Sequence, residues 1–198
     1  MTTSQKLQLD FKEVISSLME AIASETIEIY NEFSLQHELG ILLRSKLPPS
    51  WKVQFERNIS YFEIPPTSCL KREIDIVVFD PTKENKYAFE LKFPSNGQYP
   101  EQMFKCCQDI SFLEQLVQNG FSRGYFLILA DDYNFYSGNN PSPIYSYFRA
   151  TKVLHGSIQK PTGDRNTSCL ITGNYKIMWT SLTLKYKFAL VEVDKINK

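Results

Sequence analysis

The run of apolar residues from Tyr125 to Ala130 is the feature that most constrains how this chain can fold. A short, uninterrupted apolar run is typical of a strand that is buried on both faces, and such strands usually lie parallel to a neighbour. Before it, residues 101–120 repeat apolar side chains at helical spacing, and a strand-like segment extends from Tyr87 to Phe93. Two parallel strands need a long crossover connection, which this helix would provide. The sequence therefore predicts an α/β fold.

Two further helices are expected near the N-terminus. From Leu7 to Ser24 apolar residues recur every three or four positions, which marks an amphipathic helix. A second helix is expected from about Ile27 to Lys46, ahead of the two prolines at positions 48 and 49. Glu38 lies on or beside the apolar face of this second helix, where a carboxylate needs a partner or a metal ion. Glu38 is therefore a candidate functional residue.

Two neighbouring strand segments each carry an acidic residue among apolar ones. Residues 73–79 and 87–93 are separated by a short, turn-rich connection, so they are expected to form an antiparallel hairpin. Alternate residues of a strand share a face, which gives Asp75 one face of the first strand and groups Glu90 with Lys92 on the second. Because a hairpin joins the strands, Asp75 is expected to lie across from Glu90.

Two adjacent carboxylates repel each other unless a cation lies between them or one of them takes up a proton. Mg²⁺ suits such a place because it prefers oxygen ligands and keeps several waters. Asp75, Glu90 and the backbone carbonyl of Leu91 would provide protein ligands, and Glu38 would reach a second ion or a water of its shell. Lys92 would orient the attacking water and neutralise charge that develops on a phosphate.

This order of residues resembles the PD-(D/E)XK nuclease superfamily, which has the restriction-endonuclease-like fold. The resemblance covers about residues 33–130. It rests on Glu38 in a helix, Asp75 in a strand, and Glu90-Leu91-Lys92 in the adjoining strand, followed by a helix and a buried strand. Ile74 stands where the family's name has a proline, a difference that removes no chemical group from the site.

The resemblance implies a three-layer α/β fold with a central mixed β-sheet flanked by helices. It also implies a magnesium-dependent deoxyribonuclease, with Mn²⁺ as a substitute metal, that hydrolyses phosphodiester bonds in restriction or another anti-phage defence. In the family the aspartate and the glutamate bind the metal, the lysine assists the water and a helix glutamate supports the metal. These roles fall on Asp75, Glu90, Lys92 and Glu38. A glutamine or basic residue on the following helix often supports the site, which indicates Gln102 and Lys105.

Purely structural explanations exist for the same residues. Glu38 would form a salt bridge with Arg44 or Lys46, and the strand carboxylates would pair with Lys71, Arg72 or Lys92. The alternative function is a non-catalytic module that keeps the nuclease fold and binds nucleic acid or a protein. Clustered carboxylates count against that alternative, because they repel a phosphate backbone.

Charge and composition limit the partners of the chain. A formal net charge of zero argues against a broadly basic surface, so contact with DNA must come from a local patch. The neutral charge and small size fit either a homodimer or a partner protein that supplies DNA binding. No window approaches the roughly 18 apolar residues of a membrane span, and the first residues lack the apolar segment of a signal peptide. A cytoplasmic location without a membrane partner is expected.

The region 131–180 is irregular and rich in aromatic residues. A helical turn is expected at Ile144 to Ala150, and strands from Tyr175 to Leu184 and from Lys187 to Val193. The aromatic residues, together with Arg149, either pack an insertion or stack the bases of a nucleic acid. They are Tyr133, Phe135, Tyr136, Tyr145, Tyr147 and Phe148. The whole chain, 1–198, is expected to form a single domain.

Overall fold

The computed structural model describes residues 9–94, 97–140, 142–149, 151–163 and 166–195. Six strands form its central sheet: β1 (Lys52–Asn58), β2 (Glu73–Phe79), β3 (Lys86–Lys92), β4 (Arg123–Ala130), β7 (Thr180–Ser181) and β8 (Lys187–Val193). Their order across the sheet is β1-β2-β3-β4-β8-β7. Neighbouring strands are antiparallel except β3 and β4, which are parallel.

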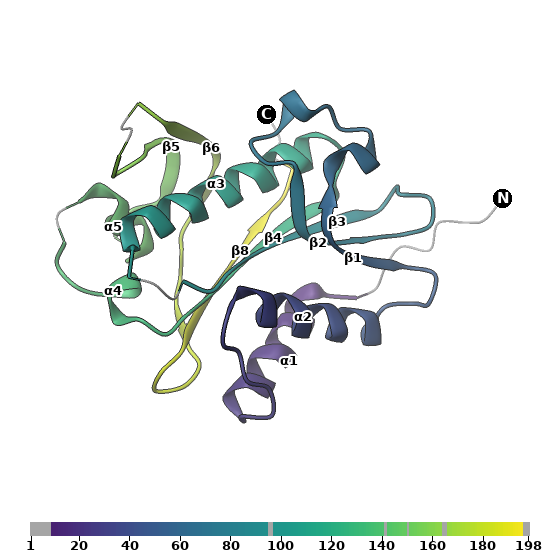
Figure 1. Cartoon of the computed structure of the whole chain (residues 1–198), viewed down its shortest axis with the longest axis horizontal. Coiled ribbons are helices and arrows are strands. Elements are labelled where there is room, and N and C mark those ends of the chain that lie inside the picture. Colours follow the sequence, from purple (N-terminus) through teal and green to yellow (C-terminus); the bar gives the residue numbers. More distant parts are fainter. Residues whose placement is uncertain (1–8, 95–96, 141, 150, 164–165, 196–198) are drawn as a thin grey trace.

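Helices cover both faces of this sheet (Figure 1). The helices α1 (Phe11–Ala23) and α2 (Glu32–Lys46) pack on one face, and α3 (Tyr99–Gln118) packs on the other. Two short 3₁₀ helices, η1 (Ile59–Phe62) and η2 (Pro66–Ser68), lie between β1 and β2. The predicted α/β class, with a mixed sheet flanked by helices, is confirmed. So is the crossover helix that joins the parallel strands β3 and β4.

The two N-terminal helices begin later than the apolar spacing predicts. The side chain of Asp10 caps α1 by accepting a hydrogen bond from the Lys12 amide at 2.9 Å. Leu7, the expected start of this helix, lies outside the described residues. For α2, the side chain of Asn31 accepts a hydrogen bond from the Ser34 amide at 2.7 Å, as the first half of a capping box. The cap places Glu32 in the first turn of α2.

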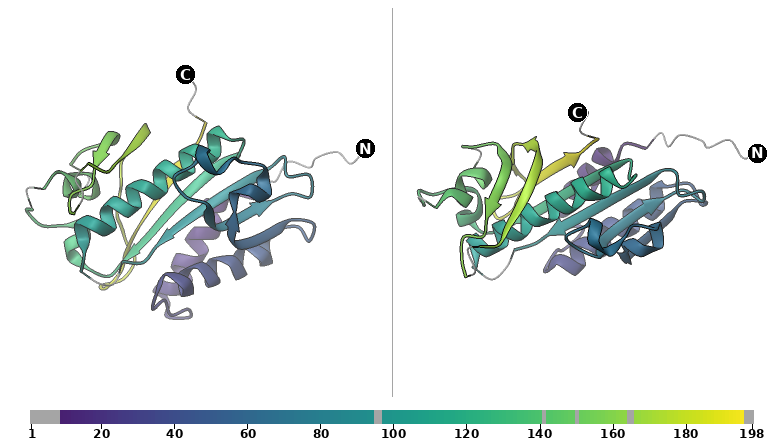
Figure 2. Two further views of the ribbon diagram at one scale, coloured as in Figure 1. Left: turned by 45° about the horizontal axis from the view of Figure 1, so that its top comes forward. Right: turned by 90° about the horizontal axis from the view of Figure 1, so that it is seen from above.

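The irregular region contains more regular structure than the sequence predicts. It holds α4 (Tyr133–Tyr136), α5 (Pro143–Phe148), and a separate hairpin of β5 (Leu154–Gln159) and β6 (Ser168–Tyr175). Figure 2 shows this hairpin beside α3, on the side of the sheet opposite α1 and α2. The predicted turn from Ile144 corresponds to α5, and its last residue, Ala150, lies outside the described residues.

The strand predicted from Tyr175 to Leu184 is wrong. The long strand there, β6, ends at Tyr175, and only Thr180 and Ser181 pair with β8. The end of β6 contacts a buried carboxylate, Glu114 of α3, which is 3% exposed. It accepts hydrogen bonds from the amides of Thr172 (2.9 Å) and Gly173 (2.6 Å) and from the Tyr175 hydroxyl (3.0 Å). These bonds hold β6 on α3, a tertiary contact that local sequence patterns do not show.

Among the described residues, no helix combines the length and the apolar character needed to cross a membrane.

Candidate functional site

Asp75 and Glu90 meet where β2 and β3 separate. The ladder between these strands pairs Ile76 with Phe89, and continuing the same register places Asp75 opposite Glu90. At this point side-chain carboxylates, and not backbone carbonyls, accept the hydrogen bonds from the strand amides. The Leu91 amide donates to Asp75 Oδ2 at 2.8 Å, and the Asp75 amide donates to Glu90 Oε1 at 3.3 Å. The predicted juxtaposition of the two carboxylates is confirmed.

Two further residues, which join the carboxylate pair, come from outside the hairpin. Lys71, just before β2, pairs with Glu90 Oε2 and also donates to Asp109 Oδ1 at 2.8 Å. Asp109 lies in α3 and is 3% exposed, and its other oxygen is 3.2 Å from the ammonium nitrogen of Lys92. Asp109 therefore bridges the two lysines above the sheet.

Asp109 is not among the residues predicted for the site, although the sequence contains a signal for it. It lies three residues after Cys106 and four before Leu113, both fully buried, so helical spacing places it on a buried face of α3. The contact of Lys71 with Glu90 was one of the structural explanations considered from the sequence. It is not a solvated surface pair, because Glu90 is fully buried.

The helix α2 reaches the cluster through residues one turn apart. Glu32 Oε1 lies 3.2 Å from the Lys92 ammonium nitrogen, and Glu32 Oε2 accepts a hydrogen bond from the Phe93 amide at 3.3 Å. Four residues later, the Gln36 side chain donates to the Asp75 carbonyl at 2.7 Å. Residues four apart share a helix face, so one face of α2 contacts the site both at Lys92 and at Asp75.

Glu38, the predicted helix carboxylate, is positioned elsewhere. In the described part of the chain, no hydrogen bond or ion pair joins it to Asp75, Glu90 or Lys92, and its side chain is 29% exposed, 3.8 Å from His37. Six helical positions separate it from Glu32, which amounts to about 120° around the axis and about 9 Å along it. The structure therefore brings Glu32, and not Glu38, to Lys92.

The remaining predicted residues are Leu91, Gln102 and Lys105. The Leu91 carbonyl accepts a hydrogen bond from the Lys92 ammonium group at 3.0 Å. Gln102 lines a small pocket with Tyr99 and Asp132, near the ends of β3 and β4. Lys105 is exposed, one turn before Asp109 on α3.

Burial sets the charge states of the cluster. It raises the pKa of Asp75 to about 6, although Lys71 and the hydrogen bond from Leu91 favour the ionised form. Burial, together with the neighbouring Asp75, also raises the pKa of Glu90 well above its ordinary value. Burial opposes the charge of Lys71, but Glu90 and Asp109 outweigh it and raise the pKa of this lysine.

Lys92 keeps its charge for a similar reason. Its side chain is 12% exposed, and burial alone would lower its pKa. Asp109 and Glu32 outweigh this effect and raise the pKa, so the ammonium group stays charged at neutral pH.

The cluster carries an excess of acidic groups. When all are ionised, four carboxylates (Glu32, Asp75, Glu90 and Asp109) face two ammonium groups, those of Lys71 and Lys92, which leaves two negative charges uncompensated. A divalent cation would neutralise that excess. Among the residues that the structure describes, no three His, Cys, Asp or Glu side chains are arranged around a common metal position. Mg²⁺ does not require such a cage, because one or two carboxylates with water and substrate oxygens hold it in many enzymes. The pair Asp75 and Glu90, with the Leu91 carbonyl, fits that requirement.

The pKa of Asp75 predicts how stability depends on pH in the absence of metal. The folded-state pKa of about 6 exceeds the ordinary value of 3.8, so the folded protein holds a proton that the unfolded chain releases as the pH rises. The contribution to stability is fully present below about pH 4 and is lost as the pH rises through 6. The loss should be about 3 kcal/mol, since a tenfold change in proton affinity corresponds to about 1.4 kcal/mol.

This dependence can be measured by urea unfolding in EDTA at several pH values between about 4 and 7. Asp75→Asn removes the titrating group, so the variant should gain stability relative to wild type as the pH rises. A difference between the two proteins that stays constant over this range would contradict the pKa assigned to Asp75.

The predicted aromatic cluster is mostly packing. Phe135, Tyr145 and Phe148 are buried in the core beside α3, whereas Tyr133 is 60% exposed. The Arg149 guanidinium lies over the Tyr145 ring at 4.3 Å. Packing of the region explains most of these residues.

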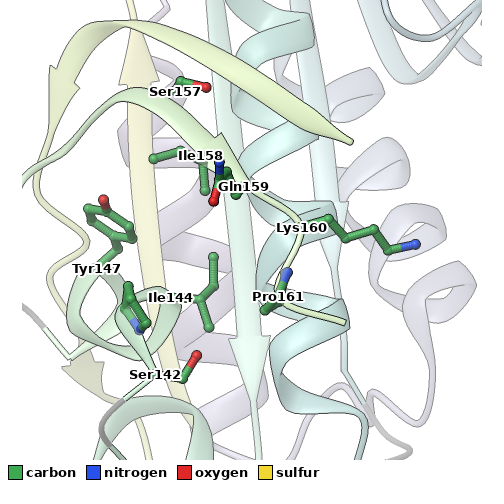
Figure 3. Close-up of a pocket in the computed structure, with 9 residues that line it drawn as sticks. Ser142, Ile144, Tyr147, Ser157, Ile158, Gln159, Lys160 and Pro161 are labelled. Carbon is green, nitrogen blue, oxygen red and sulfur yellow. The ribbon is translucent and has the colours of Figure 1, made fainter. Parts of the chain in front are cut away.

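A separate open pocket of about 470 Å³ lies between α5 and β5. Figure 3 shows Ile144 and Tyr147 of α5 on one side of it, and Ile158 and Gln159 of β5 on the other. None of its lining residues belongs to the carboxylate cluster. The pocket is therefore distinct from the candidate site.

Comparisons with protein-family models, with curated proteins and with solved structures find no match to this chain.

Proposed function

We propose that this chain is a metal-dependent nuclease that hydrolyses phosphodiester bonds of DNA, with Mg²⁺ as its metal and Mn²⁺ as a substitute. The observation that carries the proposal is the meeting of Asp75 and Glu90 on adjacent strands, with Lys92 two residues further along β3. The antiparallel strands β1, β2 and β3, followed by α3 and the parallel strand β4, support a restriction-endonuclease-like fold.

The four carboxylates of the cluster and Lys92 each have a role in this proposal. Asp75, Glu90 and the Leu91 carbonyl would hold Mg²⁺, which when bound polarises a phosphoryl oxygen and acidifies water. Lys92 carries its positive charge into the site and neutralises charge that develops on the phosphate. Glu32 and Asp109 contact the Lys92 ammonium group and position it. Glu32 is thus the α2 carboxylate that contacts the cluster, through Lys92, and the metal-supporting role predicted for Glu38 is not assigned to it.

The biological setting is part of the same proposal. Restriction or another anti-phage defence in the cytoplasm is the expected context. The neutral net charge of the chain is compatible with a homodimer or with a partner protein that supplies DNA binding.

The test is a cleavage assay on plasmid, linear duplex and single-stranded DNA with Mg²⁺, Mn²⁺ or EDTA. Wild type should cleave with either metal and be inactive in EDTA, and the matched variant Asp75→Asn should be inactive throughout. The proposal fails if wild type cleaves none of these substrates, or if Asp75→Asn cleaves as well as wild type.

One observation favours a second candidate, a non-catalytic binding module that keeps the fold. The Lys71 ammonium group already pairs with Glu90 and Asp109, so the cluster is partly neutralised without a metal. Such a module would bind nucleic acid or a protein without cleaving DNA. Calorimetry separates the two candidates. The nuclease requires that Mg²⁺ or Mn²⁺ bind to wild type but not to Asp75→Asn, whereas the binding module has no such requirement.

A further inference from the structure

Lys71 lies outside the β2–β3 hairpin and outside the helices, yet its ammonium group enters the centre of the cluster. It lies between η2 and β2, and its side chain remains 32% exposed while its nitrogen contacts Glu90 and Asp109. Lys92, by contrast, pairs with Asp109 and Glu32 and is 12% exposed. Lys71 is therefore the cation that directly neutralises the buried carboxylate of Glu90.

We propose that Lys71 is a built-in competitor for the metal, whose ammonium group occupies Glu90 until a divalent cation displaces it. This inference rests on the metal site of the proposed function. It assigns to Lys71 control over how tightly that site binds a metal.

The contacts of Glu90 show which partner has to leave. Its side chain is fully buried, and both oxygens are used: Oε1 accepts from the Asp75 amide and Oε2 pairs with Lys71. The Asp75 amide is part of the backbone of β2 and cannot withdraw without moving the strand. Lys71 sits on a flexible stem with access to solvent, and ammonium groups at the end of such stems move easily into water. A cation that binds Glu90 must therefore replace Lys71.

A second partner makes this exchange feasible. Lys71 also contacts Asp109 at 2.8 Å, so its ammonium group can leave Glu90 and still face a carboxylate. With all four carboxylates ionised, the cluster has two excess negative charges, which favour a divalent ion over a single ammonium group at the same position. Lys71 thus neutralises Glu90 in the absence of metal and would release it to a divalent ion.

The test compares metal binding in wild type, Lys71→Met and Lys46→Met by calorimetry with Mg²⁺ and Mn²⁺. Methionine keeps the apolar stem of Lys71 and removes the charge, and Lys46 is an exposed lysine at the end of α2 that serves as the matched control. Lys71→Met should bind metal at least about tenfold more tightly than wild type, because no ammonium group has to be displaced. Lys46→Met should bind like wild type.

Thermal unfolding gives a readout that does not depend on activity. In EDTA, Lys71→Met leaves Glu90 buried without its partner, and the melting temperature should fall by about 10 °C. Saturating Mg²⁺ should raise the melting temperature of this variant more than that of wild type. An equal rise in both proteins would overturn the role of Lys71.

A measurement on wild type covers the case in which Lys71→Met does not fold. Amine labelling followed by mass spectrometry should modify Lys71 several-fold faster with Mg²⁺ than with EDTA, while Lys46 reacts equally in both. Unchanged labelling of Lys71 would refute the displacement.

The outcomes also distinguish this inference from the proposed function. If wild type binds metal, Asp75→Asn does not, and Lys71→Met binds no more tightly than wild type, then the competitor role is wrong and the metal site stands. If neither wild type nor Lys71→Met binds Mg²⁺ or Mn²⁺, the metal site itself is wrong, and the role of Lys71 fails with it.

Discussion

Lys92→Ala is expected to slow DNA cleavage by about a hundredfold to a thousandfold under single-turnover conditions. The ammonium group cannot bind a cation, so under the proposed function its contribution would lie in the chemical step, where it would stabilise negative charge on the phosphate. Metal binding should stay close to that of wild type, whereas Glu90→Ala should weaken it. Calorimetry and single-turnover kinetics on the same preparations measure both effects.

This experiment needs a stability control, because the Lys92 ammonium group also pairs with Asp109 and Glu32. Thermal unfolding of Lys92→Ala must be measured, so that loss of activity can be separated from loss of the folded protein. Lys46→Ala removes an exposed lysine and should leave cleavage unchanged. If folded Lys92→Ala cleaves as fast as wild type, the nuclease assignment is wrong, and the non-catalytic module becomes the better explanation.

Glu114→Ala is expected to lower the free energy of unfolding by about 3–5 kcal/mol. The variant leaves the amides of Thr172 and Gly173 without their acceptor and removes the partner of the Tyr175 hydroxyl. These groups lie where the β5–β6 hairpin packs on α3, so an unpaired amide there has little access to water. Urea unfolding followed by circular dichroism measures the loss.

Gln118→Ala is the matched control, because it truncates an exposed polar residue one turn further along α3. It should change stability by no more than about 0.5 kcal/mol. Equal stabilities of Glu114→Ala and Gln118→Ala would mean that the buried carboxylate does not hold the hairpin in place.

The strand carboxylates were predictable because the period of a strand is two residues. That period places Asp75 on one face of β2, and Glu90 with Lys92 on one face of β3, before anything else about the fold is known. The short hairpin then fixes their juxtaposition. The apolar run of β4 and the helix before it likewise determine the crossover, since few arrangements bury both.

The helix carboxylate was not predictable in the same way. Helical spacing identifies an apolar face, but the choice between Glu32 and Glu38 depends on where the helix begins and how it crosses the sheet. The capping box of Asn31 and Ser34 sets that beginning. The contact of Glu32 with Lys92 is a tertiary contact that only the assembled fold shows.

The β5–β6 hairpin was missed for a different physical reason. Its inward-facing residues, such as Cys169 and Ile171, alternate with exposed ones, but Leu170 is apolar although exposed, and the buried Gly173 has no side chain, so the sequence shows little polar–apolar alternation. The buried side chain that fixes β6 comes from α3, far away in the sequence. Local propensity therefore gives too weak a signal at this position.

The backbone amides at the end of β3 donate hydrogen bonds to carboxylates of the cluster, so they respond to changes in its charge. The amide of Leu91 donates to the carboxylate of Asp75, and the amide of Phe93 donates to that of Glu32. The strength of each bond varies with the charge of its acceptor, and both carboxylates lie within the same network. The nuclear magnetic resonance signals of these two amide protons would therefore follow protonation or cation binding directly, without a probe attached to the protein.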